Sequence, residues 1–193
     1  MLEKINEILD FWFGGQPSLW WAKDPAVDAQ IKERFEPVLY LATQGALKPW
    51  LEQPKSCLAY IILLDQFSRN MYRNTPLAFA QDPMALQACH YGRDHKLDKE
   101  LPLIERLFFY MPLMHSEQLA SQKLCLMLLE LLLEEAKQQN SEHSQGLERA
   151  LEFSQHHYDI IQNFGRFPHR NAILERESTQ EELLFLSLPN SSF

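Results

Sequence analysis

The sequence predicts an all-α protein that folds as a single domain over residues 1–193. Apolar residues recur at helical spacing along most of the chain, whereas strand-like alternation is nearly absent. Hydrophobic residues make up 46% of the chain, which suffices for a substantial core, and no tract rich in proline, glycine and serine divides it. We therefore expect about seven to eight helices, joined by short loops and packed in antiparallel pairs.

The first two expected helices have clear boundaries. Residues 2–13 place apolar side chains on one helical face, and two glycines follow them. The next helix begins at Asp24 and Pro25, because aspartate is a favoured N-cap and proline suits the first helical position. It should run to Thr43, with a bend or a break at Pro37.

Three helices are expected in the middle of the chain. Residues 54–72 are apolar on nearly every side, as in a helix that is surrounded by others, although Asp65 lies among them. A second helix spans residues 82–90, whose first two residues repeat the Asp-Pro cap signature. The third covers residues 102–110 and ends before Pro112.

Three more helices are expected toward the C-terminus. Ser116 or His115 leads into a long helix that ends near Gln138. A polar stretch separates it from a helix over residues 147–163, which a following glycine ends. The S-x-x-E pattern of residues 178–181 predicts the capping box of a short terminal helix.

The composition argues against several functional classes. A formal net charge of −8 disfavours a surface that neutralises nucleic acid or anionic lipid. The three cysteines have no C-x-x-C spacing, so neither a disulfide framework nor a zinc cluster is indicated. The N-terminal residues do not resemble a signal peptide, and the most apolar run is too short to span a bilayer. We expect a cytoplasmic protein without a cofactor and without nucleic-acid or membrane partners.

Two segments of the chain contain arginine but no lysine. Residues 63–73 and 163–176 hold five of the nine arginines and none of the nine lysines. Exposed ion pairs accept either residue, whereas bidentate hydrogen bonding to a carboxylate or a phosphate requires a guanidinium group. The selection therefore indicates a geometric need, and the recipient is either an internal carboxylate or an external anion.

The first arginine segment supplies one group of candidate ligand-binding residues. Helical spacing places Asp65 and Arg69 one turn apart, and Arg73 one further turn along. Asn70 lies in the adjacent row of the same predicted helix. Because this helix should be buried, the polar patch must be well satisfied by its own hydrogen bonds and ion pairs.

A second group surrounds the start of the long helix near residue 116. His115, Gln118 and Gln122 share one helical face, and Glu117 stands at the helix start. The first turn of a helix offers unpaired amide N–H groups that can receive an anion. In the alternative interpretation Ser116 only caps the helix, and Glu117 only favours its positive end.

The third group comes from the expected helix over residues 147–163 and the loop behind it. His156 and Asp159 share a helical face that could point toward the loop, while His157 should face elsewhere. No histidine spacing typical of a metal site occurs on this helix, so we expect no bound metal. The loop mixes aromatic residues with candidate binding residues, namely Arg166, His169, Arg170 and Asn171.

Five motifs in this order carry a resemblance to a known family: DFWFG, LLDQFSRNMYR, MPLMHSE, FGRFPHRN and STQEELLFL. Together they resemble the bacterial family catalogued as domain of unknown function 924, over nearly the whole chain. The resemblance implies an all-helical, tetratricopeptide-repeat-like superhelical fold, and it implies no established activity. The chain departs from the family at Glu175, where glycine is usual, which puts a tight backbone turn there in question.

These observations support three hypotheses of function. In the first, Arg69, Arg73, Arg166 and Arg170 line a pocket for a small anionic ligand, bearing phosphate or carboxylate, and His115 or His169 could transfer a proton there. In the second, the protein is a helical scaffold that binds a peptide or protein partner. In the third, the arginines and their carboxylates form a purely structural ionic network. Whether the protein is an enzyme stays open.

Overall fold

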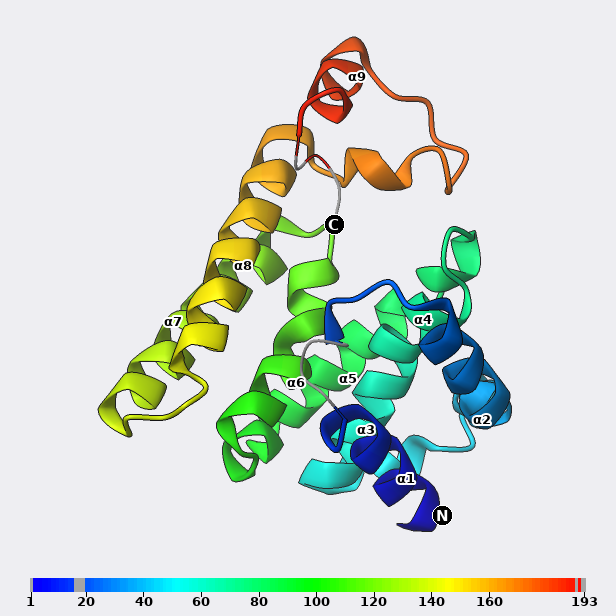
Figure 1. Ribbon diagram of the computed structural model, residues 1–193, viewed down its shortest axis with the longest axis vertical. Coiled ribbons are helices and arrows are strands. Elements are labelled where there is room, and N and C mark those ends of the chain that lie inside the picture. The colour runs from blue at the N-terminus through cyan, green and yellow to red at the C-terminus, as the bar shows by residue number, and fades with distance from the viewer. Residues whose placement is uncertain (1, 16–19, 190, 192–193) are drawn as a thin grey trace. The chain divides into compact units, whose positions relative to one another are not determined.

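The computed structural model describes residues 2–15, 20–189 and 191, and helices dominate it (Figure 1). None of these residues belongs to a strand, which confirms the predicted all-α class. If α3, the π-helical turn behind it and α4 are counted as one continuous helix, the described residues form eight helices, as expected.

The α-helices follow one another with short connections. Their bounds are α1 Leu2–Phe13, α2 Pro25–Thr43, α3 Pro54–Ile62, α4 Ser68–Met71, α5 Asp82–Asp94, α6 Leu103–His115, α7 Leu119–Gln138, α8 Ser144–Phe164 and α9 Gln180–Leu186. The π-helical turn covers Leu63–Phe67. Short 3₁₀ turns cover Lys48–Glu52, Pro76–Ala78, Leu97–Glu100 and Pro168–Arg170.

The chain forms two compact units. The first contains Met1–Arg73 and Leu77–Pro112, and the second contains Asn74–Pro76 and Leu113–Phe193. Each unit has its own buried side chains and its own polar interactions, so each is described by itself. The expected single domain over the whole chain stays a prediction.

The first unit is built around α3 and the π-helical turn. Every residue from Ser56 to Ser68 is buried, which confirms that this helix is surrounded by others. Helices α1 and α5 pack against α3, and α2 packs against the turn and α4. Phe67, which is fully buried, meets the rings of Phe35 and Trp12 at centroid distances of 4.7 and 5.7 Å.

The second unit contains an antiparallel pair of long helices, α7 and α8, which lie side by side (Figure 1). Their buried faces repeat at helical spacing, for example at Cys125, Leu129 and Leu132 of α7. At the end of α8, Ile160 and Ile161 form a small core with Phe167. Helix α9 packs against the 3₁₀ turn that follows Phe167.

Two prolines lie inside continuous helices. The expected break at Pro37 does not occur, while the expected bend there stays a prediction, and the helix expected to end before Pro112 continues past it. Pro37 lies inside α2, which runs unbroken to Thr43 because the proline ring is exposed and water can serve the freed carbonyl group. Pro112 lies inside α6, which continues to His115. There the buried Gln122 side chain donates its Nε2 to the carbonyls of Met114 and Ser116, both at 2.6 Å. Gln122 thus satisfies carbonyl groups that the end of α6 leaves unpaired.

Some helix ends lie where the capping residues and glycines of the sequence predicted them. Asp24 caps α2 as predicted and accepts hydrogen bonds from the Ala26 and Val27 amides. Gly165 ends α8 in the left-handed conformation, with φ of 68°, where glycine carries no steric penalty. The helix predicted to begin at Asp82 and Pro83 does begin there, but Asp82 is the first residue of α5 and not its N-cap, and its carboxylate binds Arg69.

Candidate functional site

The sequence-predicted site residues are divided between the two units. Those of the first arginine segment lie in the first unit: Asp65, Arg69, Asn70 and Arg73. The others lie in the second unit: His115, Glu117, Gln118, Gln122, His156, Asp159, Arg166, His169, Arg170 and Asn171.

In the first unit, Arg69 joins two carboxylates. Asp65 lies in the π-helical turn with no exposed surface, and its Oδ1 is 3.0 Å from Nη1 of Arg69. The same guanidinium donates two parallel hydrogen bonds to Asp82, at 2.8 and 2.9 Å. Gln66 donates its side-chain amide to the other oxygen of Asp65. The predicted pair one turn apart therefore forms, and its arginine also binds the start of α5.

A second arginine of this unit binds α2. Arg73 donates from Nε and Nη2 to the two carboxylate oxygens of Asp28, at 2.7 and 2.8 Å. Asn70 donates to the same carboxylate at 2.8 Å. Burial raises the pKa of Asp28, but the hydrogen bonds from Arg73 and Asn70 outweigh it, so its pKa lies below the ordinary value.

In the second unit, a carboxylate and a guanidinium hold the backbone of Phe167. Glu117 accepts the Phe167 N–H at 2.8 Å, and Arg176 donates to the Phe167 carbonyl at 3.1 Å. Arg176 also makes a bidentate pair with Glu117, at 2.8 and 3.0 Å. Burial raises the pKa of Glu117, yet Arg176 and the Phe167 amide bring its pKa below the ordinary value. Glu117 therefore fixes the loop and does more than favour a helix end.

The Glu182 carboxylate is the centre of a second group of ionic and hydrogen-bond contacts in this unit. Arg166 donates from Nε and Nη2 to its two carboxylate oxygens, at 2.6 and 2.7 Å. The Thr179 amide and the Asn171 side chain also donate to this carboxylate, at 2.8 and 3.2 Å. Arg166 lowers the pKa of Glu182 most, to about 2, and the Thr179 amide acts in the same direction.

The capping box of α9 lies one residue later than predicted. Thr179 and Glu182 form it, in place of Ser178 and Glu181. Glu182 is buried and already bound to Arg166, whereas Glu181 is exposed. The Ser178 hydroxyl instead accepts a hydrogen bond from Asn171 at 3.0 Å. The ionic contact therefore decides which of two adjacent patterns caps the helix.

A left-handed residue brings Arg176 to its partners. Glu175, which stands where the family usually has glycine, adopts φ of 54°. The Arg176 amide then donates back to the Asn171 carbonyl at 2.8 Å, and Arg176 Nε donates to the Asn171 side chain at 2.9 Å. The tight turn that the missing glycine put in question is therefore present.

Around Phe167, three histidines and one arginine form what we call the Phe167 ring cluster: Phe167, His115, His157, His169 and Arg170. The Phe167 ring is fully buried and lies 5.4 Å from the His157 ring and 5.6 Å from the His169 ring. The Arg170 guanidinium lies 4.4 Å above the same ring and donates to the His115 carbonyl at 3.0 Å. The His115 and His157 rings are 6.3 Å apart.

Two imidazoles of the ring cluster are held neutral. Burial, followed by the nearby His115, lowers the pKa of His157 to about 3. His157 uses Nδ1 to donate to the Phe153 carbonyl at 2.7 Å, which fixes its ring and its tautomer. Burial, followed by the charge of Arg170, lowers the pKa of His169 to about 4. Both rings are therefore uncharged at neutral pH.

Comparisons with known proteins place this geometry in a family. A model of the bacterial protein family of unknown function DUF924 matches residues 8–190. The chain belongs to this family. A solved structure of a protein of unknown function from Agrobacterium tumefaciens is 35% identical, covers 96% of this chain and 98% of its own, and has a TM-score of 0.84. No curated protein matches the chain.

In this DUF924 protein His157 contacts the loop at Phe167, although His156 was predicted to face the loop and His157 to face elsewhere. His157 is buried in the ring cluster, whereas His156 is only half-buried and Asp159 is exposed. Asp159 accepts a hydrogen bond from Gln155 at 2.8 Å. The buried stripe of α8 runs through Ser154 and His157, so the apolar periodicity of the helix was the signal that identifies His157.

The predicted face of His115, Gln118 and Gln122 does not form. His115 ends α6, Gln118 is exposed at the N-cap position of α7, and Gln122 is buried against the end of α6. The Ser116 hydroxyl accepts the Gln118 amide at 3.2 Å, so it fixes the turn before the helix. These residues belong to two helices, which is why a single helical spacing misplaced them.

Sequence reasoning missed three of the carboxylates that the arginines bind. Asp28 precedes the first arginine segment, Asp82 follows it, and Glu182 lies beyond the second segment. Arg176 belongs to the second segment, but its role was not assigned. A lysine-free arginine cluster indicates that planar partners exist, yet only the folded chain shows which carboxylates they are.

Within residues 2–15, 20–189 and 191, no group of three or more histidine, cysteine, aspartate or glutamate residues is arranged to hold a metal ion. The helices of the described part of the chain are also not long and apolar enough to cross a membrane.

Replacing Arg69 by methionine tests the ion pairs that Arg69 makes with Asp65 and Asp82. Arg69→Met leaves the fully buried Asp65 without its cation, so the free energy of unfolding should fall by about 3–5 kcal/mol. Urea denaturation followed by circular dichroism measures this loss. Arg73→Met is the matched control and should lose only about 1 kcal/mol, because its pair with Asp28 is more exposed. Equal losses in both variants would contradict the assignment.

Glu182→Gln tests how the stabilisation by the Arg166–Glu182 ion pair depends on pH. The folded-state pKa of Glu182 is about 2 and its ordinary value is 4.5, so the carboxylate stabilises the fold fully above pH 4.5. This stabilisation is lost as pH falls from 4.5 toward 2. The variant should therefore show a shallower fall of melting temperature between about pH 5 and pH 3. Glu181→Gln, on the exposed side of α9, should keep the wild-type slope.

Glu175→Gly should stabilise the protein. A left-handed conformation costs a residue with a Cβ atom about 1–2 kcal/mol, and the greater freedom of glycine in the unfolded chain offsets part of the relief. We expect a gain of about 0.5–1 kcal/mol in the free energy of unfolding. Glu175→Ala removes the same charge without relieving the backbone, so a gain of equal size in that variant would refute the explanation.

Proposed function

We propose that this DUF924 protein binds a small anionic ligand, bearing phosphate or carboxylate, at the Phe167 ring cluster. The observation that carries the proposal is the position of two guanidinium groups at Phe167: Arg170 lies 4.4 Å from its ring and Arg176 donates to its carbonyl at 3.1 Å. Beyond burial, Arg170 lowers the pKa of both His157 and His169, and Arg176 also lowers that of His169. Glu117 acts on His169 in the opposite direction, and it is already paired with Arg176. The balance at this cluster favours negative charge.

The groups of the cluster are of the kind that bind anions. A guanidinium group offers several N–H donors in one plane, which match the oxygens of a phosphate or a carboxylate. A neutral imidazole can add one N–H donor without a second positive charge, and Arg170 discourages its protonation. Phe167, His169 and Arg170 of the cluster lie on a loop that the Arg166–Glu182 and Arg176–Glu117 ion pairs hold in place, which reduces the entropy lost on binding.

The other arginines support the site in this proposal. Arg69, Arg73 and Arg166 each bind a carboxylate of their own unit through two nitrogens. We assign them to holding the helices and the loop, and Arg170 to the ligand. A pocket that draws on arginines of both segments stays a prediction. If the bound anion is a substrate, His115 and His169 are our candidates for proton transfer.

Thermal unfolding with defined anions tests the proposal. Inorganic phosphate and citrate should raise the melting temperature by about 3–6 °C at a concentration of about ten times the dissociation constant. The increase should disappear in Arg170→Lys, which keeps the charge but loses the bidentate donors. It should shrink in His169→Gln, which keeps a hydrogen-bonding side chain.

Arg73→Lys is the matched control, because it alters an arginine of the first unit in the same way. It should keep the full response to the anion, measured against its own baseline. A wild-type protein that neither anion stabilises would overturn the proposal. So would an Arg170→Lys variant that responds as the wild type does.

The second candidate function is a helical scaffold for a peptide or protein partner. The tetratricopeptide-repeat-like superhelical arrangement that the family resemblance implies would suit this role. It is favoured by exposed leucines at and after α9, where Leu183, Leu184 and Leu188 are 51%, 62% and 59% exposed. A protein that copurifies in a fixed ratio, and is lost when these leucines become serine, would favour this candidate over the first.

A further inference from the structure

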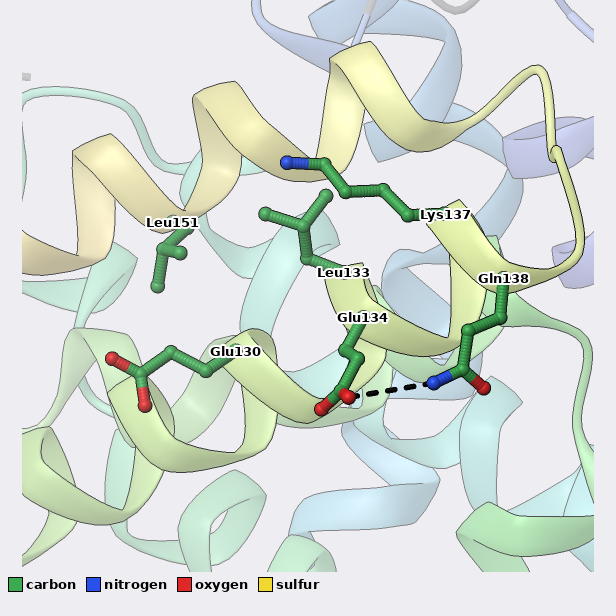
Figure 2. A pocket seen from close by; sticks show the side chains of 6 residues that line it. All are labelled: Glu130, Leu133, Glu134, Lys137, Gln138 and Leu151. Carbon is green, nitrogen blue, oxygen red and sulfur yellow. Dashed lines mark hydrogen bonds between the residues drawn. The ribbon is translucent and has the colours of Figure 1, made fainter.

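The face that α7 and α8 form together contains a hollow outside the Phe167 ring cluster (Figure 2). The hollow has a volume of about 540 Å³, within the range of pockets that accept small groups. Its lining comes from one face of α7 and from Leu151 of α8; the residues of α7 are Glu130, Leu133, Glu134, Lys137 and Gln138.

The lining is apolar in the middle and acidic at one side. Leu133 and Leu151 lie in the middle of the hollow, and Glu130 and Glu134 extend from the same helix with their carboxylates apart (Figure 2). Glu134 accepts a hydrogen bond from Gln138 at 3.4 Å. The one cation of the lining, Lys137, pairs with Glu148 of α8 at 3.1 Å. The charge that this lining presents to a partner protein is therefore negative.

Exposed apolar side chains extend this face along α7. Met127 and Leu131 are 48% and 51% exposed, and helical spacing places them on the same side as Glu130 and Glu134. Exposed large apolar side chains on one helix face form a surface that another polypeptide can cover.

We propose that this α7–α8 face binds a basic amphipathic helix of a partner protein. Aliphatic side chains of the partner contact Met127 and Leu131 and enter the hollow between Leu133 and Leu151. Lysine or arginine side chains of the partner bind Glu130 and Glu134. Charge complementarity selects this partner, because nucleic acid and anionic lipid would be repelled by the same carboxylates and by the net charge of −8. The arrangement is a helix laid in a groove.

A designed peptide tests the proposal directly. The probe is a labelled helix of about 18 residues, or five turns, with leucine on one face and lysine on the other. Fluorescence anisotropy should show saturable binding to the full-length protein that weakens as salt is raised. A peptide with glutamate in place of lysine, and one with serine in place of leucine, should each bind at least about tenfold more weakly.

Variants of the protein locate the binding face. The double variant Glu130→Lys and Glu134→Lys should weaken binding of the leucine–lysine peptide by at least about tenfold, and Leu131→Ser by several fold. The matched control is Glu3→Lys with Glu33→Lys, which changes the net charge equally at exposed positions of α1 and α2. Circular dichroism confirms that each variant keeps its helices.

Three results would overturn the proposal. Equal weakening in the Glu3 and Glu33 control would mean that only net charge attracts the peptide. Equal binding of the serine peptide would mean that the apolar hollow takes no part. Unchanged binding in Leu131→Ser and in the Glu130 and Glu134 double variant would place the peptide elsewhere.

Discussion

A carboxylate withdrawn from water inside a helical protein must be paired with a fixed cation, and both units of this protein depend on that pairing. Asp65 in the first unit has no exposed surface, and Glu182 in the second is 2% exposed. Arg166 binds Glu182 through two parallel hydrogen bonds, whereas Arg69 makes one contact with Asp65 and two parallel hydrogen bonds with Asp82. Lysine cannot form such a bidentate pair, which explains the choice of arginine for Arg69 and Arg166.

The parts of the fold that local chemistry determines could be predicted from the sequence. Asp24 with Pro25 begins α2, and Gly165 ends α8, because cap and left-handed positions impose narrow demands on residue type. The parts that distant contacts determine could not. Gln122 satisfies the carbonyl of Met114 at the end of α6, and Thr179 caps α9 because Glu182 is held by Arg166.

The same division applies to the candidate site. The residue types of the arginine segments indicated bidentate partners, and both segments have them. The identities of the partners followed from tertiary packing, since Asp28 is 45 residues from Arg73 and Glu117 is 59 residues from Arg176. The choice between His156 and His157 was decided by which side of α8 is apolar, and periodicity applied to the whole helix identifies the second.

The π-helical turn at Leu63–Phe67 holds more residues than an α-helical turn, and this has a consequence for how the first unit tolerates length changes. Deletion of a single residue there would let a regular α-helix run from Pro54 to Met71, with good backbone geometry throughout. Because the π-helical turn already holds one extra residue, the side chains after such a deletion would keep their directions around the helix axis. Arg69 and Arg73 would still reach Asp82 and Asp28, whereas a deletion within the regular helix α3 would rotate both by about 100° and break both pairs.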